Sequence, residues 1–257
     1  MTDTTDSFLV PDWPAPDSIG AAVSLRSGGI SKAPYLTNNM ALHVGDNSVK
    51  VHKNRTNLGD RLKLKSMPVW LDQVHGNDVI YAPDIAVSCK ADGSFSDKPD
   101  VVCAVLTADC LPILICNESG TEVAAIHAGW RSLSSGIVRN ALTHFSAPCR
   151  TIMAFLGPAI GQNVYEVGAE VKAEFESNAL SKSHQRQISD AFFPNHLNIK
   201  AGSYMADLYK LARAEFLACG VASVYGGNSC AFSDSERFYS YRRDPITGRN
   251  ASLIWIK

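Results

Sequence analysis

Three apolar runs in the middle of the chain predict buried strands. Residues 101–106 (VVCAVL), 111–116 (LPILIC) and 122–126 (EVAAI) are rich in β-branched and aliphatic side chains. The turn-forming sequence NESG at 117–120 separates the second run from the third. Because nearly every position is apolar, both faces of these strands should be buried. The pattern predicts central strands of a sheet, the last two of them joined as a hairpin.

The apolar spacing becomes helical after the third run. Apolar side chains recur three or four positions apart between Leu133 and Phe145, and Ser132 is the predicted N-cap. Similar spacing predicts helices over 166–176 and 204–219, the second ended by Gly220.

Other segments predict more strands in an irregular order. Strands are expected at 22–25 and 69–74, and the stretches 237–243 and 251–256 flank the turn sequence DPITG as a second hairpin. This order differs from a regular alternation of strands and helices. It predicts an α+β fold, a single domain of mixed β-sheets with flanking helices.

Length and composition are consistent with one domain. The 257 residues are 46% hydrophobic, which is enough for a sizeable core, and no linker or internal repeat divides them. We therefore expect one domain over residues 1–257, with residues 1–17 as an extended amino-terminal arm.

The charge balance excludes several classes of protein. Lys and Arg number 24 against 25 Asp and Glu, so no basic surplus is available for nucleic-acid backbones. No apolar run is long enough for a membrane helix, and the amino end lacks the pattern of a signal peptide. We expect a cytoplasmic protein that binds neither nucleic acid nor membrane.

Seven cysteines raise the question of whether one is chemically active. Their number is odd and no two form a CxxC pair, so reduced thiols in a reducing compartment are expected. Most should be small buried hydrophobic residues.

His75 in QVHG, Cys110 in TADC and His127 in HAGWR each stand where a predicted strand meets a turn. If residues 118 and 119 form a two-residue hairpin loop, Cys110 lies directly opposite His127, with Cβ atoms about 4.5–5.5 Å apart. Two imidazoles and one thiolate suit zinc or copper, and three protein ligands leave a fourth position open for catalysis. The alternative is a pair of hydrogen-bonded histidines beside a buried thiol.

Several arginines adjoin glycines or turns and could bind an anion. They are Arg26 in LRSGGIS, Arg131 in HAGWR, and Arg242 and Arg243 in SYRRDPITGR. Guanidinium groups bind phosphate through paired hydrogen bonds, although such residues are also common in solvated turns. Asp109, next to Cys110, could act as a base, orient a ligand or cap backbone groups.

The blocks QVHG (73–76), AVLTADCLPILI (104–115), AAIHAGWRS (124–132), LGPAIG (156–161) and SYRRDPITGR (240–249) resemble the bacterial laccase-domain family. This family is also described as multicopper polyphenol oxidase-like proteins, purine nucleoside phosphorylases or peptidoglycan editing factors. The segment APYLTNNMALHVGD at 33–46 is similar to the family's amino-terminal block. The resemblance covers nearly the whole chain, in order.

The resemblance implies an α+β domain with a metal held by His75, Cys110 and His127. It also implies zinc-dependent phosphorolysis of adenosine, inosine and methylthioadenosine, with some adenosine deamination. Arg26, Asn39, Gln73 and Arg243 fall in the family's motif blocks and would contact nucleoside or phosphate. Copper-dependent phenol oxidation and editing of peptidoglycan precursors are the other activities attributed to members.

The histidine content and the candidate site residues help to choose among these activities. A multicopper oxidase needs about ten histidines, many in HxH pairs, whereas this chain has seven histidines and no HxH pair. An open zinc position suits deamination, and phosphorolysis would place phosphate against Arg26, with Asp109 as a proton donor or acceptor. A metal-free hydrolase with Cys110 as nucleophile and His127 as base remains an alternative, as does a non-catalytic binding protein.

Overall fold

The computed structural model describes residues 7–85, 89–194 and 202–257. Two sheets stand at its centre. The larger sheet has six strands in the order β12 (Ser223–Gly226), β8 (Ile152–Leu156), β6 (Leu111–Asn117), β7 (Val123–Ala128), β4 (Gly93–Ser96) and β3 (Val79–Tyr81). The smaller sheet has four, in the order β1 (Phe8–Leu9), β2 (Ile19–Ser24), β13 (Asn250–Ile256) and β5 (Cys103–Thr107).

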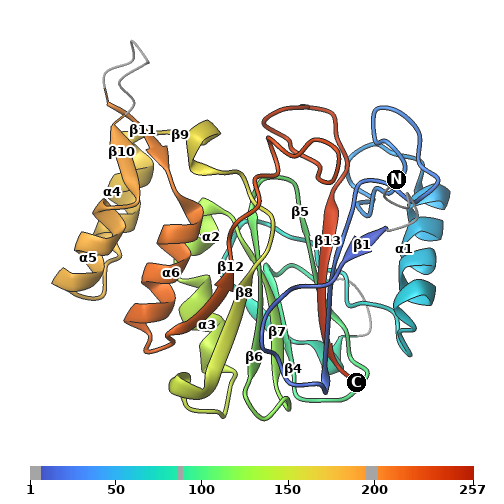
Figure 1. The fold of residues 1–257 in the computed structure, drawn as a ribbon, viewed down its shortest axis with the longest axis horizontal. Coiled ribbons are helices and arrows are strands. Elements are labelled where there is room, and N and C mark those ends of the chain that lie inside the picture. Colours follow the sequence, from blue (N-terminus) through green and yellow to red (C-terminus); the bar gives the residue numbers. More distant parts are fainter. Residues whose placement is uncertain (1–6, 86–88, 195–201) are drawn as a thin grey trace.

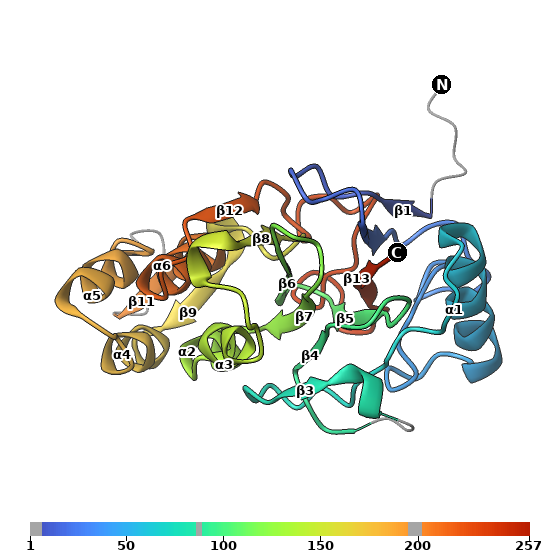
Figure 2. The same ribbon diagram turned by 90° about the horizontal axis from the view of Figure 1, so that it is seen from below.

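Helices cover the outer faces of both sheets. On one side lie α2 (Trp130–Ser134), α3 (Ile137–Thr143), α4 (Ala169–Ser177), α5 (Lys182–Ser189) and α6 (Leu208–Ala218), and on the other lies α1 (Ser48–Leu62). A small sheet of β10 (Phe192–Pro194), β11 (Ser203–Ala206) and β9 (Glu166–Gly168) adjoins the larger helical group. Short 3₁₀ turns occupy Ala82–Asp84, Cys149–Thr151 and Gln162–Val164. Figures 1 and 2 show the layers as helices, six-stranded sheet, four-stranded sheet and α1.

Alternation along the strands accounts for this layering. In β6, Ile113 and Ile115 pack with the residues of α3 and α6, whereas Leu114 and Cys116 pack against the four-stranded sheet. Successive side chains of a strand point to opposite faces, so a strand that is apolar throughout can bury both. The α+β prediction is confirmed, and the three central strands form where the apolar runs predict them. The single-domain boundary and the arm over residues 1–17 stay predictions; residues 1–6 lie outside the described residues.

The register of the β6–β7 hairpin differs from the prediction. Pro112, not Cys110, lies opposite His127, because the connecting loop is longer than two residues. The Asn117 side chain accepts hydrogen bonds from the backbone N–H groups of Thr121 and Glu122, which stabilises the longer loop. The shift is two residues, and an even shift keeps each side chain on its predicted face of the sheet.

The prediction of a hairpin near the carboxyl end is also wrong. Strand β13 pairs with β2 and β5, while residues 237–243 form turns. The Arg243 guanidinium donates to the carbonyls of Ala231, Phe232 and Phe238, which holds this segment in a loop.

Other predicted elements begin or end elsewhere. The helix expected after residue 132 is divided by Gly136, which has a φ of 90°. Each of the helices predicted over 166–176 and 204–219 is preceded by a short strand, β9 or β11. Residues 69–74 contribute isolated bridges rather than a strand. Among the described residues, no helix combines the length and apolar character that crossing a bilayer requires.

A buried carboxylate joins three helices of the larger helical group. Glu215 of α6 is 2% exposed and lies 3.5 Å from the Arg139 Nε of α3 and 3.4 Å from the His184 Nε2 of α5. Burial raises the pKa of Glu215 to about 7, although Arg139 opposes this. The folded protein therefore holds this proton more tightly than the unfolded chain does.

Replacing Glu215 tests whether its raised pKa makes the stability of the protein depend on pH. Since the pKa of Glu215 is raised on folding, its ionisation removes stability as pH rises from about 4.5 to about 7. We expect Glu215→Gln to raise the melting temperature relative to the original protein more at pH 8 than at pH 5, as measured by thermal denaturation. Glu236→Gln, at an exposed position, should show no pH-dependent difference. An equal effect of Glu215→Gln at both pH values would contradict this assignment.

Candidate metal site

Three side chains from separate parts of the chain meet at one end of the sheets. His75 lies in the loop before β3, Cys110 immediately precedes β6, and His127 lies near the end of β7. One donor atom from each lies within 4.8 Å of the others, and the two imidazole rings are 4.8 Å apart edge to face. His75 is exposed, Cys110 half-buried and His127 buried. Among the described residues, this is the group of His, Cys, Asp or Glu side chains close enough to share a metal ion.

Gly129 makes room for the thiol of Cys110. Leu111 pairs with Ala128, so continuing the register by one residue places Gly129 beside Cys110 and His127 diagonally across. A Cβ atom at position 129 would lie 3.0 Å from Cys110 Sγ and 3.4 Å from His75 Cδ2. The absent side chain lets sulfur and both imidazoles converge despite the shifted register.

The carboxylate of Asp92 orients two of the three side chains. It accepts backbone N–H bonds from Val74 (3.1 Å), His75 (3.0 Å) and Gly76 (2.6 Å). Its Oδ1 also lies 2.7 Å from Nδ1 of His127. Successive N–H groups around an anion form a backbone nest, here with His75 in the left-handed region at φ 60°. Asp92 thus fixes both the loop that carries His75 and the ring of His127.

This contact sets the proton positions in the site. The Asp92 carboxylate can only accept, so Nδ1 of His127 carries a proton, and the other ring nitrogen, Nε2, is left to interact with Cys110. Burial raises the pKa of Asp92, but hydrogen bonds from His127 and the nest outweigh this and hold it below its ordinary value.

Cys110 and His127 favour each other's charged forms. Burial raises the pKa of the Cys110 thiol, yet His127 and His75 outweigh burial and lower that pKa to about 6. Burial lowers the pKa of His127, and the charges of Cys110 and Asp92 raise it to about 9. The thiolate is the form of cysteine that binds metals and attacks electrophiles.

A cavity of about 360 Å³ opens beside the three side chains. Its other walls combine polar, aromatic and aliphatic side chains: His43, Gln73, Leu106, Thr107, Ala108, Tyr241 and Arg249. Cavities of this size accommodate small molecules. The site therefore combines soft and borderline metal donors with room for a small substrate.

The predicted substrate residues fall into two groups. Gln73 lines the cavity, and its amide bonds to both backbone groups of Leu106 (2.9 and 2.8 Å). Arg26, Asn39 and Arg243 are not among the residues that line it. Arg26 instead donates to the Ser235 carbonyl. The roles of Arg26, Asn39 and Arg243 as substrate contacts stay predictions.

Asn39 and Asp109 hold backbone near the cavity. The buried amide of Asn39 accepts from the N–H groups of Ala41 and Arg249. Asp109, in the left-handed region at φ 85°, accepts from the N–H of Arg242 through Oδ2, and its buried Oδ1 has no hydrogen-bond partner. The catalytic role expected of Asp109 stays a prediction.

Sequence reasoning overlooked Asp92, His43, Thr107, Tyr241 and Arg249. Asp92 is followed by Gly93 and resembles an ordinary turn residue. Arg249 ends the block SYRRDPITGR, so its place in that motif was the available signal. His43 has no sequence neighbour that indicates a pocket.

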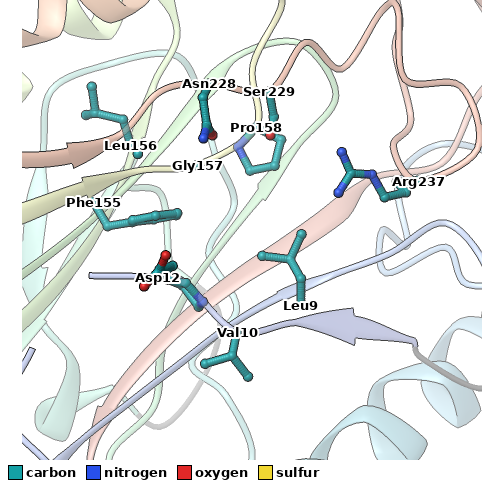
Figure 3. A pocket seen from close by; sticks show the side chains of 12 residues that line it. Leu9, Val10, Asp12, Phe155, Leu156, Gly157, Pro158, Asn228, Ser229 and Arg237 are labelled. Carbon is teal, nitrogen blue, oxygen red and sulfur yellow. The ribbon is translucent and has the colours of Figure 1, made fainter. Parts of the chain in front are cut away.

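A second cavity lies elsewhere, between the segment after β1 and the ends of β8 and β12 (Figure 3). It measures about 450 Å³ and carries Asp12 and Arg237 near opposite sides. Arg237 is paired with Asp234, so its charge is already compensated. Neither a candidate metal ligand nor a predicted substrate residue lines this cavity.

Comparisons with known proteins agree on one family. The family model described as multi-copper polyphenol oxidoreductase laccase matches residues 20–257. A protein of Shigella flexneri named purine nucleoside phosphorylase YfiH is 45% identical over 250 residues, covering 97% of this chain and 98% of that protein. Purine nucleoside phosphorylase PA4543 of Pseudomonas aeruginosa is 46% identical, covering 98% and 99%.

Solved structures extend the likeness to the fold. The crystal structure of Neisseria meningitidis protein NMB0706 superposes with a TM-score of 0.90 at 40% identity, covering 98% of this chain and all of that one. That of YlmD from Geobacillus stearothermophilus gives a TM-score of 0.81 at 28% identity, covering 100% and 98%.

Removing the charge of Asp92 should weaken metal binding. Asp92→Asn keeps the size of the side chain but leaves two of its four N–H contacts without an acceptor, because each carboxylate oxygen accepts two of them. Loss of such supporting contacts typically weakens metal affinity about 10–100-fold. Zinc affinity, measured by competition with a chelator, should fall by that factor while circular dichroism shows a folded protein. Asp97→Asn, which alters an exposed contact with Tyr81, is the matched control. Unchanged zinc affinity in a folded Asp92→Asn variant would contradict the role of Asp92.

Proposed function

The chain belongs to the multi-copper polyphenol oxidoreductase laccase family, and on that premise we propose that it is a zinc-dependent purine nucleoside phosphorylase with adenosine deaminase side activity. The substrates are adenosine, inosine and methylthioadenosine with phosphate. The observation that carries the proposal is the convergence of His75, Cys110 and His127 on the wall of a cavity sized for a small molecule. The names of the relatives support the choice of a purine nucleoside.

The donor set fits zinc with an open position. One sulfur and two imidazole nitrogens suit zinc or copper, and three protein ligands are typical of catalytic rather than structural zinc. When bound, the ion supplies Lewis-acid polarisation at its fourth position. The chain holds seven histidines, too few for a multicopper oxidase site within one subunit.

The reaction itself exchanges one bond at the sugar. The bond between purine nitrogen and C1′ breaks, a phosphate oxygen bonds to C1′, and the purine leaves with the bonding electrons and takes up a proton. The Asp92 contact keeps the His127 proton at Nδ1 during turnover. Asp109 is proposed as the group that exchanges a proton with substrate: it adjoins Cys110 and its Oδ1 has no hydrogen-bond partner, although Asp109 is not among the residues that line the cavity. The free state of all seven cysteines is consistent with a reducing cytoplasm.

A metal-free hydrolase is the second candidate, because Asp92, His127 and Cys110 form a continuous acid, base and nucleophile series. In that reading Cys110 attacks substrate and His127 takes its proton. His75 then has no role, whereas a metal uses all three side chains.

Removing the metal distinguishes the zinc-dependent phosphorylase from the metal-free hydrolase. Protein purified without a metal-affinity tag should contain one zinc per chain and convert adenosine and phosphate to adenine and ribose 1-phosphate, as followed by chromatography. We expect a chelator to abolish activity and added zinc to restore it. Activity that persists in metal-free protein and is lost on alkylation of Cys110 would instead support the hydrolase.

A variant of the sulfur ligand tests the site directly. Cys110→Ser should lose zinc and at least 100-fold of the phosphorolysis rate, since a serine hydroxyl is a poor zinc ligand at neutral pH. Cys219→Ser, beyond the end of α6, is the control and should keep both. A Cys110→Ser protein with full zinc content would refute the assignment of this residue.

A further inference from the structure

The candidate metal cavity continues into a second cavity that the proposed function does not use. The neighbouring space measures about 470 Å³ and shares His43 and Leu106 with the first as common wall residues. Its remaining walls include Arg55, Trp70, Asp72 and Lys90. The two spaces are therefore adjoining parts of one depression.

Arg55 is a buried cation without an acidic partner. It belongs to α1, is 7% exposed, and donates through Nε to the Met40 carbonyl at 2.8 Å. Its guanidinium lies 4.0 Å from the centre of the Trp70 ring, and no carboxylate of the described residues pairs with it. Burial lowers the pKa of Arg55 to about 10. Buried charges are normally paired, so the cavity is where a counter-charge belongs.

Other cations extend from Arg55 toward the metal site. Arg249 lines the first cavity, donates to the carbonyls of Thr247 and Gly248, and likewise has no ion pair among the described residues. His43 lines both cavities, and burial together with the charges of Arg249 and Arg55 lowers its pKa, which Asp72 opposes.

The lining carries a net positive charge. Lys90 adds a third cation, and Asp72 is the acidic residue that lines the second cavity. Both are exposed, so solvent screens them more than it screens Arg55. Arg55 and Lys90 outweigh Asp72 in the second cavity, and Arg249 of the adjoining cavity adds to the positive charge, which favours an anionic ligand.

We propose that the cavity between Arg55 and Lys90 is an anion subsite that binds a phosphate group beside the metal cavity. The inference rests on the proposed function for the identity of the anion, since phosphorolysis requires phosphate next to the nucleoside. It assigns this role to Arg55, His43 and Lys90 rather than to Arg26. Guanidinium and ammonium groups bind phosphate oxygens through charge-assisted hydrogen bonds. The phosphate is either inorganic phosphate or the phosphate of a nucleotide.

Binding measurements without turnover test the subsite. Inorganic phosphate and adenosine monophosphate are each titrated into the zinc-loaded protein and its variants by calorimetry. We expect the dissociation constant for phosphate to rise about tenfold in Arg55→Lys and severalfold in Lys90→Ala. Arg237→Ala, in the separate cavity of Figure 3, should bind as the original protein does. Lys90 is exposed, so its variant remains informative if Arg55→Lys fails to fold.

Each outcome bears on the inference. If the same variants weaken the binding of adenosine monophosphate but not that of inorganic phosphate, the subsite is supported and the phosphate group that it binds belongs to a nucleotide. If neither compound binds, or if both bind folded Lys90→Ala and Arg237→Ala equally, the inference is overturned. Phosphate binding that depends on Lys90 in a protein without phosphorolysis would refute the proposed function and leave the subsite intact. Phosphorolysis by Lys90→Ala with an unchanged KM for phosphate would refute the subsite and leave the proposed function intact.

Discussion

The carboxylate of Asp92 is the contact on which the arrangement of the candidate metal site depends. It is fully buried and accepts three successive backbone N–H groups of the His75 loop as well as the Nδ1 proton of His127. A buried charge is costly unless such partners surround it. The same four contacts that stabilise the carboxylate therefore fix the positions of two imidazoles around the Cys110 thiol.

The site also depends on the packing of the two sheets. Asp92 precedes β4 of the six-stranded sheet, while Gln73 binds both backbone groups of Leu106 in β5 of the four-stranded sheet. The loop from Gln73 to Gly76 is thus held from both sheets at once. Because an ion bound only by the folded protein stabilises it, metal binding at His75 should also stabilise the sheet-to-sheet contact.

Local sequence identified the side chains but not the long-range contacts. Cys110 and His127 stand at strand ends that apolar runs and turn residues mark, and His75 lies in the motif QVHG of the loop before β3. Spacing and family resemblance were therefore enough to select the three residues. The register was wrong because Asn117 stabilises a longer loop, and Gly129 restores the convergence. Neither effect can be read from a hydrophobic pattern. Asp92 and Arg249 were missed because their importance lies in contacts with distant residues.

The central claim is that His75, Cys110 and His127 hold one catalytic zinc ion. X-ray absorption at the zinc edge of the purified protein tests it most directly. The account predicts one sulfur ligand at about 2.3 Å, two imidazole nitrogens at about 2.0–2.1 Å, and one further light atom at the open position. A zinc spectrum without sulfur, or with two or more sulfur ligands, would contradict it.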